Sequence, residues 1–350
     1  MKRFLCLAMS MVTALCLTLT GCGSVSDDTT VATLGDTNIP YGVANFYVQY
    51  MQSLYDSYYL DYYGDSMWSS DLTGEGSTME EECRADFLEN IESFYRMDAH
   101  AEEYGVTLSD EELEAIDAAA EQFMEDNSET AIKQMGATKE IVAEYLRLAT
   151  IESYMFDAIY AACDTEITDE EAACRTFTYI ELSLEGETDE SGDVTELTDE
   201  QIENLKEEAE AIIAGTGTND LETMADIYGA ETATYSYNEG DDGMDEAVLA
   251  AADELSEGEV YETYVETDTA LYIIRLDSEY DEEASADKKT ELQDEADQAY
   301  YEEVYAAWQE EVEFNVVEKV WKKISFAHLY TYISSDESGD ASGDSSGDTE

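Results

Sequence analysis

The strongest chemical signal in the sequence is a cysteine, Cys22, that follows the run Leu19-Thr20-Gly21. This spacing is typical of a bacterial lipobox, in which a small residue precedes a cysteine whose thiol is acylated and which becomes the new N-terminus. Two bases and the apolar stretch 4–17 come before it, and that stretch is too short for a membrane-spanning helix. We therefore expect a signal peptide over residues 1–21, a lipid anchor of acyl chains such as palmitate at Cys22, and a tether over residues 22–29. An ordinary secretory signal with an incidental cysteine is the alternative.

Other residues with distinctive chemistry are scarce in the mature sequence. Apart from Cys22 and the two cysteines of the signal, only Cys83, Cys163 and Cys174 remain, and no CxxC spacing indicates zinc or redox chemistry. A Cys163–Cys174 disulfide and unlinked buried thiols are both compatible with this pattern.

Metal sites are also poorly supported. His100 and His328 are too few for a histidine-based site, and we expect His100 on a helix surface. The acidic loops 189–193 and 239–243 offer carboxylates to a hard cation such as Ca²⁺, but neither has the EF-hand spacing. We interpret both loops as solvated segments and expect no metal and no cofactor.

Charge narrows the range of partners. The 350 residues include 86 acids and 15 bases, for a formal charge of −71. Such a chain is repelled by nucleic acid and by anionic membrane surfaces, so neither is an expected partner. The composition is nonetheless 44% hydrophobic and 11% aromatic, which is enough to build one or two folded domains.

The elements that would position these residues are helical in the first half of the chain. After a short strand pair, apolar residues recur at helical steps, and the tyrosine stripe that runs to Tyr62 is more typical of a core or groove lining than of a cofactor site. Three capping boxes predict helix starts at Ser109, Thr168 and Thr198. The expected elements are strands within 30–39 and helices at 46–62, 83–104, from 109, and 139–163.

Near Cys174 the helical pattern gives way to a mixture of strand and helix patterns. An alternating strand at 177–184 and a second at 270–276 enclose helical segments at 199–214, 221–228 and 245–255. A long helical pattern then returns. We expect an α+β fold with these domains: a helical N-terminal domain at 30–170, an α+β insert at 172–280, a C-terminal segment at 285–326 whose apolar stripe packs on the N-terminal domain, and a disordered acidic tail at 334–350.

The order of these parts resembles the extracytoplasmic foldases of the PrsA and SurA type. The opening Val31–Ile39 and the turn Ala101–Glu112 are similar to segments of that family, and the resemblance extends from about residue 30 to 326. It implies a discontinuous helical chaperone-like core with an inserted domain.

The insert resembles a parvulin-type peptidyl-prolyl isomerase domain, with Ala252–Val260 and Ala270–Leu276 as the similar stretches. The resemblance assigns the family's two histidine positions to Tyr179 and Tyr272. It assigns the positions that enclose the proline ring to Met244, Val248 and Asp253, of which only Met244 matches. The sequence therefore leaves open whether the chain is an enzyme, with isomerase activity expected to be weak or lost.

The resulting functional hypothesis is an extracytoplasmic folding factor on the cell membrane, held there through its lipid anchor only. Its partners would be unfolded or partly folded exported polypeptides. The sequence is compatible with a monomer or a homodimer. The alternatives are an active parvulin-type isomerase and a non-enzymatic surface or solute-binding lipoprotein.

Overall fold

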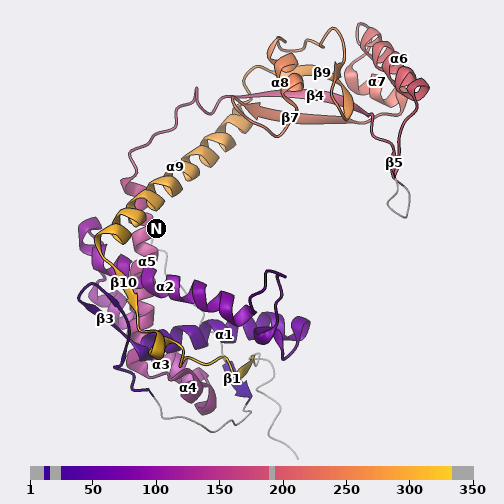
Figure 1. Ribbon diagram of the computed structural model, residues 1–350. Coiled ribbons are helices and arrows are strands. Elements are labelled where there is room, and N and C mark those ends of the chain that lie inside the picture. Colours follow the sequence, from indigo (N-terminus) through magenta and orange to yellow (C-terminus); the bar gives the residue numbers. More distant parts are fainter. Residues whose placement is uncertain (1–11, 16–24, 189–193, 333–350) are drawn as a thin grey trace, which may run out of the picture. The chain divides into compact units, whose positions relative to one another are not determined.

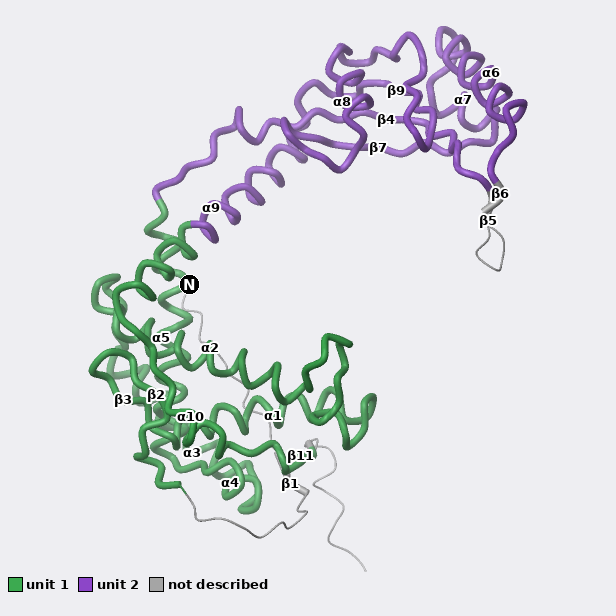
Figure 2. The backbone as a smooth tube through the Cα atoms, in the orientation of Figure 1, with its two compact units in different colours: residues 1–163, 300–350 green, residues 164–299 purple. Residues whose placement is uncertain are grey.

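A computed structural model describes residues 12–15, 25–188 and 194–332 of the chain (Figure 1). It divides into two compact units, residues 1–163 with 300–350, and residues 164–299 (Figure 2). The predicted lipidation site Cys22 and the acidic tail 334–350 lie outside the described residues, as does the predicted signal peptide apart from the strand β1 (Val12–Leu15).

Helices make up most of the first unit, as the sequence predicts. A capping box begins α2 at Thr78 and another begins α3 at Ser109, and in each the side chain and a glutamate satisfy backbone N–H groups that the helix leaves unpaired. Gly105, in the left-handed conformation with φ 69°, ends the turn that follows α2. The helices are α1 (Tyr41–Tyr63), α2 (Met79–His100), α3 (Asp110–Asp126), α4 (Glu129–Met135) and α5 (Lys139–Ala162), with short 3-10 turns at Met67–Ser69 and Ala101–Tyr104.

Aromatic side chains form the core of this unit. Tyr47 of α1 packs edge-on against Phe94 of α2, with ring centroids 5.2 Å apart, and its ring lies 5.7 Å from that of Tyr145 on α5. Burial raises the pKa of both phenols above the ordinary value, so they stay neutral. One ring cluster thus joins three helices.

A half-buried carboxylate lies beside this core. Glu152 of α5 accepts a hydrogen bond from Ser93 Oγ at 2.5 Å. Burial raises the pKa of Glu152 to about 7, with the Ser93 hydrogen bond opposing the shift. The side chain is therefore partly protonated near neutral pH.

The C-terminal segment completes the first unit. Its strand β10 (Phe314–Val316) pairs antiparallel with β2 (Thr30–Leu34), which also pairs with β3 (Thr37–Pro40), giving the order β10-β2-β3. The short helix α10 (Glu318–Trp321) follows, and β11 (Leu329–Tyr332) pairs with β1.

Arg96 of α2 holds this returning segment in place. Its side chain is only 1% exposed and forms an ion pair with Glu92. Its Nη1 donates to the carbonyl oxygens of Trp308 at 2.6 Å and Val312 at 3.1 Å, at the end of α9 (Glu282–Glu311). The Trp308 carbonyl also accepts from the backbone N–H of Val312 at 3.2 Å, so the buried cation adds a second, charged donor there and complements the negative end of the helix dipole.

His100 differs from the sequence expectation. It is 7% exposed rather than on the surface, because its ring stacks on Trp308 with centroids 4.2 Å apart and planes 6° apart. The same segment that Arg96 caps therefore covers the histidine.

The second unit is a four-stranded antiparallel sheet with helices on both faces. The strand order is β7-β4-β9-β8, so the two long strands β4 and β9 are central. The elements are β4 (Cys174–Ser183), β5 (Glu187–Thr188), β6 (Val194–Thr195), α6 (Asp199–Gly215), α7 (Leu221–Tyr228), β7 (Thr232–Asn238), α8 (Glu246–Asp253), β8 (Val265–Glu266) and β9 (Ala270–Ser278).

Alternation along β4 divides the core of this unit between the two faces. Phe177 and Tyr179 belong to the core cluster under α8, whereas Ile180 belongs to the cluster under α6 and α7. The helices and small sheets confirm the expected α+β class.

The helix expected after Thr168 is absent. The capping hydrogen bonds form, with Thr168 N donating to Glu171 Oε2 at 2.9 Å, but the residues that follow make only turns. The reason is that β4 begins at Cys174, which leaves no length for a second helical turn. Cys174 carries a free, buried thiol, so the disulfide considered with Cys163 is not formed.

Replacing Arg96 should test how firmly the C-terminal segment is held. Arg96→Met removes the cation, so Glu92 loses its ion pair and the carbonyls of Trp308 and Val312 lose a charged donor, although Val312 N still donates to Trp308. We expect a loss of about 3 kcal/mol or more in the free energy of unfolding. Urea denaturation followed by circular dichroism measures it. Lys139→Met, which removes an exposed ion pair with Asp117, is the control and should leave the midpoint nearly unchanged. Equal effects of the two changes would contradict the role of Arg96.

The half-buried Glu152 predicts a pH dependence of stability. Because its pKa rises from 4.5 in the unfolded chain to about 7 in the fold, the folded state holds the extra proton between these values. The contribution of Glu152 to the free energy of unfolding is therefore largest below pH 4.5, and it is lost as the pH rises through 7. Glu152→Gln should stabilise the protein at pH 8 by up to about 3 kcal/mol and have little effect at pH 4.5. A variant that shifts the melting temperature equally at both pH values would rule this out.

Candidate functional site

The two tyrosines assigned from the sequence to the first and last strands of the insert lie together. Tyr179 is on β4 and Tyr272 on β9, and their ring centroids are 5.7 Å apart. The register explains this contact, because Tyr272 is opposite Glu181, two residues along β4 from Tyr179. Burial, followed by the nearby charge of Glu181, raises the pKa of Tyr272. The phenol is therefore neutral and can act only as a hydrogen-bond donor or acceptor.

Met244 and Val248 come to the same face of the sheet but in different roles. Val248 of α8 is fully buried and belongs to the core between helix and sheet. Met244, in the loop before α8, is half-buried and packs at the edge of that core. Of the two, only Met244 has a partly exposed apolar surface for a ligand.

The side chain of Asp253 is 61% exposed. It accepts a hydrogen bond from the Tyr237 hydroxyl at 2.6 Å and lies 3.7 Å from Arg175 Nε. The same arginine donates from Nη2 to the carbonyl of Leu255 at 2.7 Å, just past α8. Asp253 therefore joins the end of α8 to β4 and β7, and does not put a charge beside the tyrosine pair.

The face between β4, β9 and α8 can thus offer apolar contact and neutral hydrogen bonds. Tyr179 also packs on Phe177, which in turn packs on Tyr235, so rings fill this face. The raised pKa of the Tyr272 phenol makes this ring a poor proton donor and acceptor near neutral pH. The arrangement can hold an apolar side chain but lacks an acid–base pair.

A second candidate surface was not recognised from the sequence. The tyrosine stripe of α1 continues past the end of the helical core, so that its first half is buried and its last turns are exposed. Tyr58 is 77% exposed and Tyr62 is 79% exposed, with Tyr59 and Tyr63 at 45% and 44%. We call these four residues the tyrosine surface. The helical spacing that indicated burial holds only as far as other elements cover α1.

The rings of the tyrosine surface contact one another. Tyr62 and Tyr63 are edge-on at 4.7 Å between centroids, and Tyr59 is 6.3 Å from Tyr63. An exposed group of four tyrosines offers a large contact area with few rotatable bonds, and each ring carries a hydroxyl at its tip. Such surfaces suit the binding of irregular polypeptide segments.

None of the helices in the described residues is both long and apolar enough to cross a membrane. In the same residues, no three histidine, cysteine or acidic side chains converge as metal ligands would.

No protein-family model matches the sequence, and no curated protein does. Solved structures resemble it at low identity. The foldase PrsA of Lactococcus lactis is 15% identical with a TM-score of 0.36, over 85% of this chain and 99% of that one. PrsA of Bacillus cereus is 18% identical with a TM-score of 0.33, over 70% and 91% of the two chains.

A structure of SurA-like chaperones from Campylobacter jejuni is also similar, at 10% identity and a TM-score of 0.29, over 82% of this chain and 99% of that one. These are foldases and chaperones of the type that the sequence resembles. Because each TM-score is below 0.5, we base the functional proposal on the residues of the chain itself.

Proposed function

We propose that this protein is an extracytoplasmic folding factor that holds unfolded or partly folded exported polypeptides. The observation that carries the proposal is the tyrosine surface, an uncovered group of four rings on a chain of charge −71. Exposed aromatic groups on an otherwise strongly charged surface mark interaction sites. Tyrosine suits unfolded clients because one side chain serves both apolar and hydrogen-bonding partners.

The charge supports the same role. A strongly acidic body stays soluble while an aggregation-prone segment is bound to it, because like charges keep the complexes apart. The contacts of four tyrosines are individually weak, which allows a client to leave and fold. Weak and reversible contact is what a holding function requires.

The second unit acts in this proposal as a parvulin-like scaffold with little or no isomerase activity. A prolyl isomerase must lower a barrier of about 20 kcal/mol by favouring a twisted amide. The Tyr179–Tyr272 pair stands where the resembled family has histidines, Asp253 faces solvent, and Val248 is part of the core. Met244 alone does not enclose a proline ring.

The location in the proposal is the outer face of the cell membrane, with a diacylated Cys22 as the anchor. Its support is the lipobox run before Cys22. Two acyl chains hold a protein where one would not, so no spanning helix is needed.

Removing the exposed rings should impair client holding without unfolding the protein. The paired change Tyr58→Ser and Tyr62→Ser should raise by about tenfold the protein concentration needed to suppress aggregation of a denatured client. Tyr228→Ser with Tyr280→Ser, which removes two exposed tyrosines of the second unit, is the matched control and should change nothing. Melting temperatures of all variants should agree, since the four side chains are exposed. Full protection by the first variant would refute the proposed surface.

The mature chain should leave prolyl isomerisation of a short peptide near its uncatalysed rate. Tyr272→Phe, which removes the hydroxyl and keeps the ring, should not alter that rate. The measurement is a protease-coupled or NMR exchange assay with an ordinary parvulin as the positive control. Turnover close to that of the control, lost in Tyr272→Phe, would contradict the scaffold role and make the phenol catalytic.

The proposed anchor is tested by replacing Cys22, whose thiol would carry the lipid. Cys22→Ala should move the protein from the membrane fraction to the soluble fraction, because an unacylated chain has lost its lipid. Cys83→Ala, at a buried thiol, serves as the control and should remain in the membrane fraction. A Cys22→Ala variant that stays with the membrane would show that another anchor exists.

A further inference from the structure

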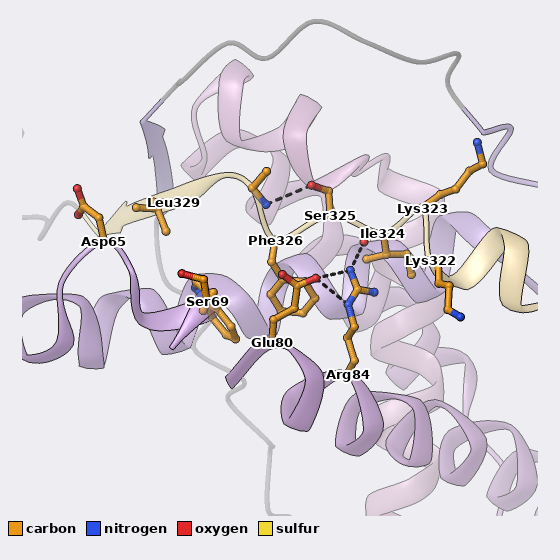
Figure 3. A pocket seen from close by; sticks show the side chains of 12 residues that line it. Asp65, Ser69, Glu80, Arg84, Lys322, Lys323, Ile324, Ser325, Phe326 and Leu329 are labelled. Carbon is orange, nitrogen blue, oxygen red and sulfur yellow. Dashed lines mark hydrogen bonds and ion pairs between the residues drawn. The ribbon is translucent and has the colours of Figure 1, made fainter. Parts of the chain in front are cut away.

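A pocket of about 560 Å³ lies in the first unit, between the start of α2 and the segment that leads to β11 (Figure 3). Its wall is aromatic, with Trp68 and Phe326 at 4.8 Å between ring centroids. Trp68 is fixed in position because its indole N–H donates to the buried Asp56 at 2.7 Å. The pocket therefore has a rigid apolar side before any ligand arrives.

One end of the pocket is cationic. Arg84, Lys322 and Lys323 line that end, with the two lysine side chains pointing in different directions, whereas Asp65 and Leu329 lie at the other end (Figure 3). These three bases stand out in a chain with 86 acids and 15 bases. Such a concentration of positive charge against the sign of the whole chain favours an anionic ligand.

The acids around the pocket do not cancel this charge completely. Glu80 accepts from Arg84 Nε at 2.9 Å, and Glu318 lies 3.1 Å from Lys322 Nζ. Lys323 has no ion-pair partner in the described part of the chain. Asp65, the remaining acid of the lining, is at the opposite end. One exposed ammonium is thus left for a ligand.

Arg84 also retains an unused donor. Its guanidinium lies 4.9 Å over the Phe326 ring and donates from Nη2 to the carbonyl of Ile324. The remaining nitrogen, Nη1, is covered and has no acceptor among the described residues. A covered donor without an acceptor is unfavourable by about 1–3 kcal/mol, so an oxygen that reaches it is bound more favourably.

We propose that this pocket binds the C-terminal carboxylate of a polypeptide whose last side chain is apolar or aromatic. A terminal residue carries its carboxylate and its side chain on one Cα, which matches a guanidinium 4.9 Å from an aromatic ring. The inference rests on the proposed function, and it adds a subsite that selects one end of a client.

Peptide binding to the full mature chain tests the proposal. The probe is a short neutral fluorescent peptide that ends in phenylalanine, compared as free acid and as amide by anisotropy. The free acid should bind about tenfold more tightly, because only it can pair with the cationic end. Lys322→Ser with Lys323→Ser should remove that preference and leave the binding of the amide unchanged.

The matched control removes the same charge elsewhere. Lys206→Ser with Lys319→Ser also removes two positive charges, but neither residue lines the pocket. This variant should keep the tenfold preference. Equal affinity for acid and amide in the wild type would overturn the proposal. So would a loss of preference as large in the control as in the pocket variant.

Two further arms distinguish the source of the carboxylate. An amidated peptide that ends in glutamate should bind no better than the phenylalanine amide, and equal affinity to the free acid would overturn the terminal assignment. A chain that ends at residue 333 should bind the free acid as the full chain does. A large gain in affinity there would show that the acidic tail of the chain is the ligand instead.

Failure of the pocket proposal can be distinguished from failure of the proposed function. Acid-independent peptide binding with intact protection of a denatured client would overturn the pocket and leave the tyrosine surface in place. Acid-selective peptide binding without protection of a denatured client would overturn the tyrosine surface and leave the pocket in place.

Discussion

The fold of the helical unit depends on a buried cation, Arg96, that ends a helix from a distant part of the sequence. It donates to two carbonyl oxygens near the end of α9 and is neutralised by Glu92. Without it, the carbonyls of Trp308 and Val312 would lose their charged donor and Glu92 its ion-pair partner. The interaction therefore couples the helical block to the segment that supplies β10, α10 and β11.

The returning segment determines which parts of α1 are covered. Tyr330 of β11 donates its hydroxyl to Gln49 at 2.6 Å, and its N–H donates to Asp56, so that β11 packs along the middle of α1. Beyond Asp56 the covering ends, and Tyr58 and Tyr62 are exposed. The same segment provides Phe326 and the two lysines of the pocket. Both proposed binding surfaces thus depend on how far the C-terminal segment reaches.

The sequence predicts the helices well where local chemistry decides them. The capping boxes at Ser109 and Thr198 begin helices as expected, but the one at Thr168 does not, because a strand starts six residues later. Short elements with few buried residues escape detection: β7 buries only Tyr237 and Asn238, and α4 only Ala131 and Met135. The resemblance singled out Tyr179 and Tyr272, and their contact follows from the strand register of the structure. The exposure of Tyr62 and the burial of His100 depend on tertiary packing that no local pattern encodes.

The central claim is that unfolded polypeptide contacts the exposed end of α1. Site-specific photo-crosslinking tests it most directly, with a photoreactive phenylalanine placed at position 58 in one sample and at position 280 in another. Both side chains are exposed, at 77% and 48%, and both positions hold tyrosine. The account predicts that a denatured client cross-links at 58 and not at 280, and that a folded client cross-links at neither. Cross-linking at 280 alone, or equal yields from folded and unfolded client, would contradict it.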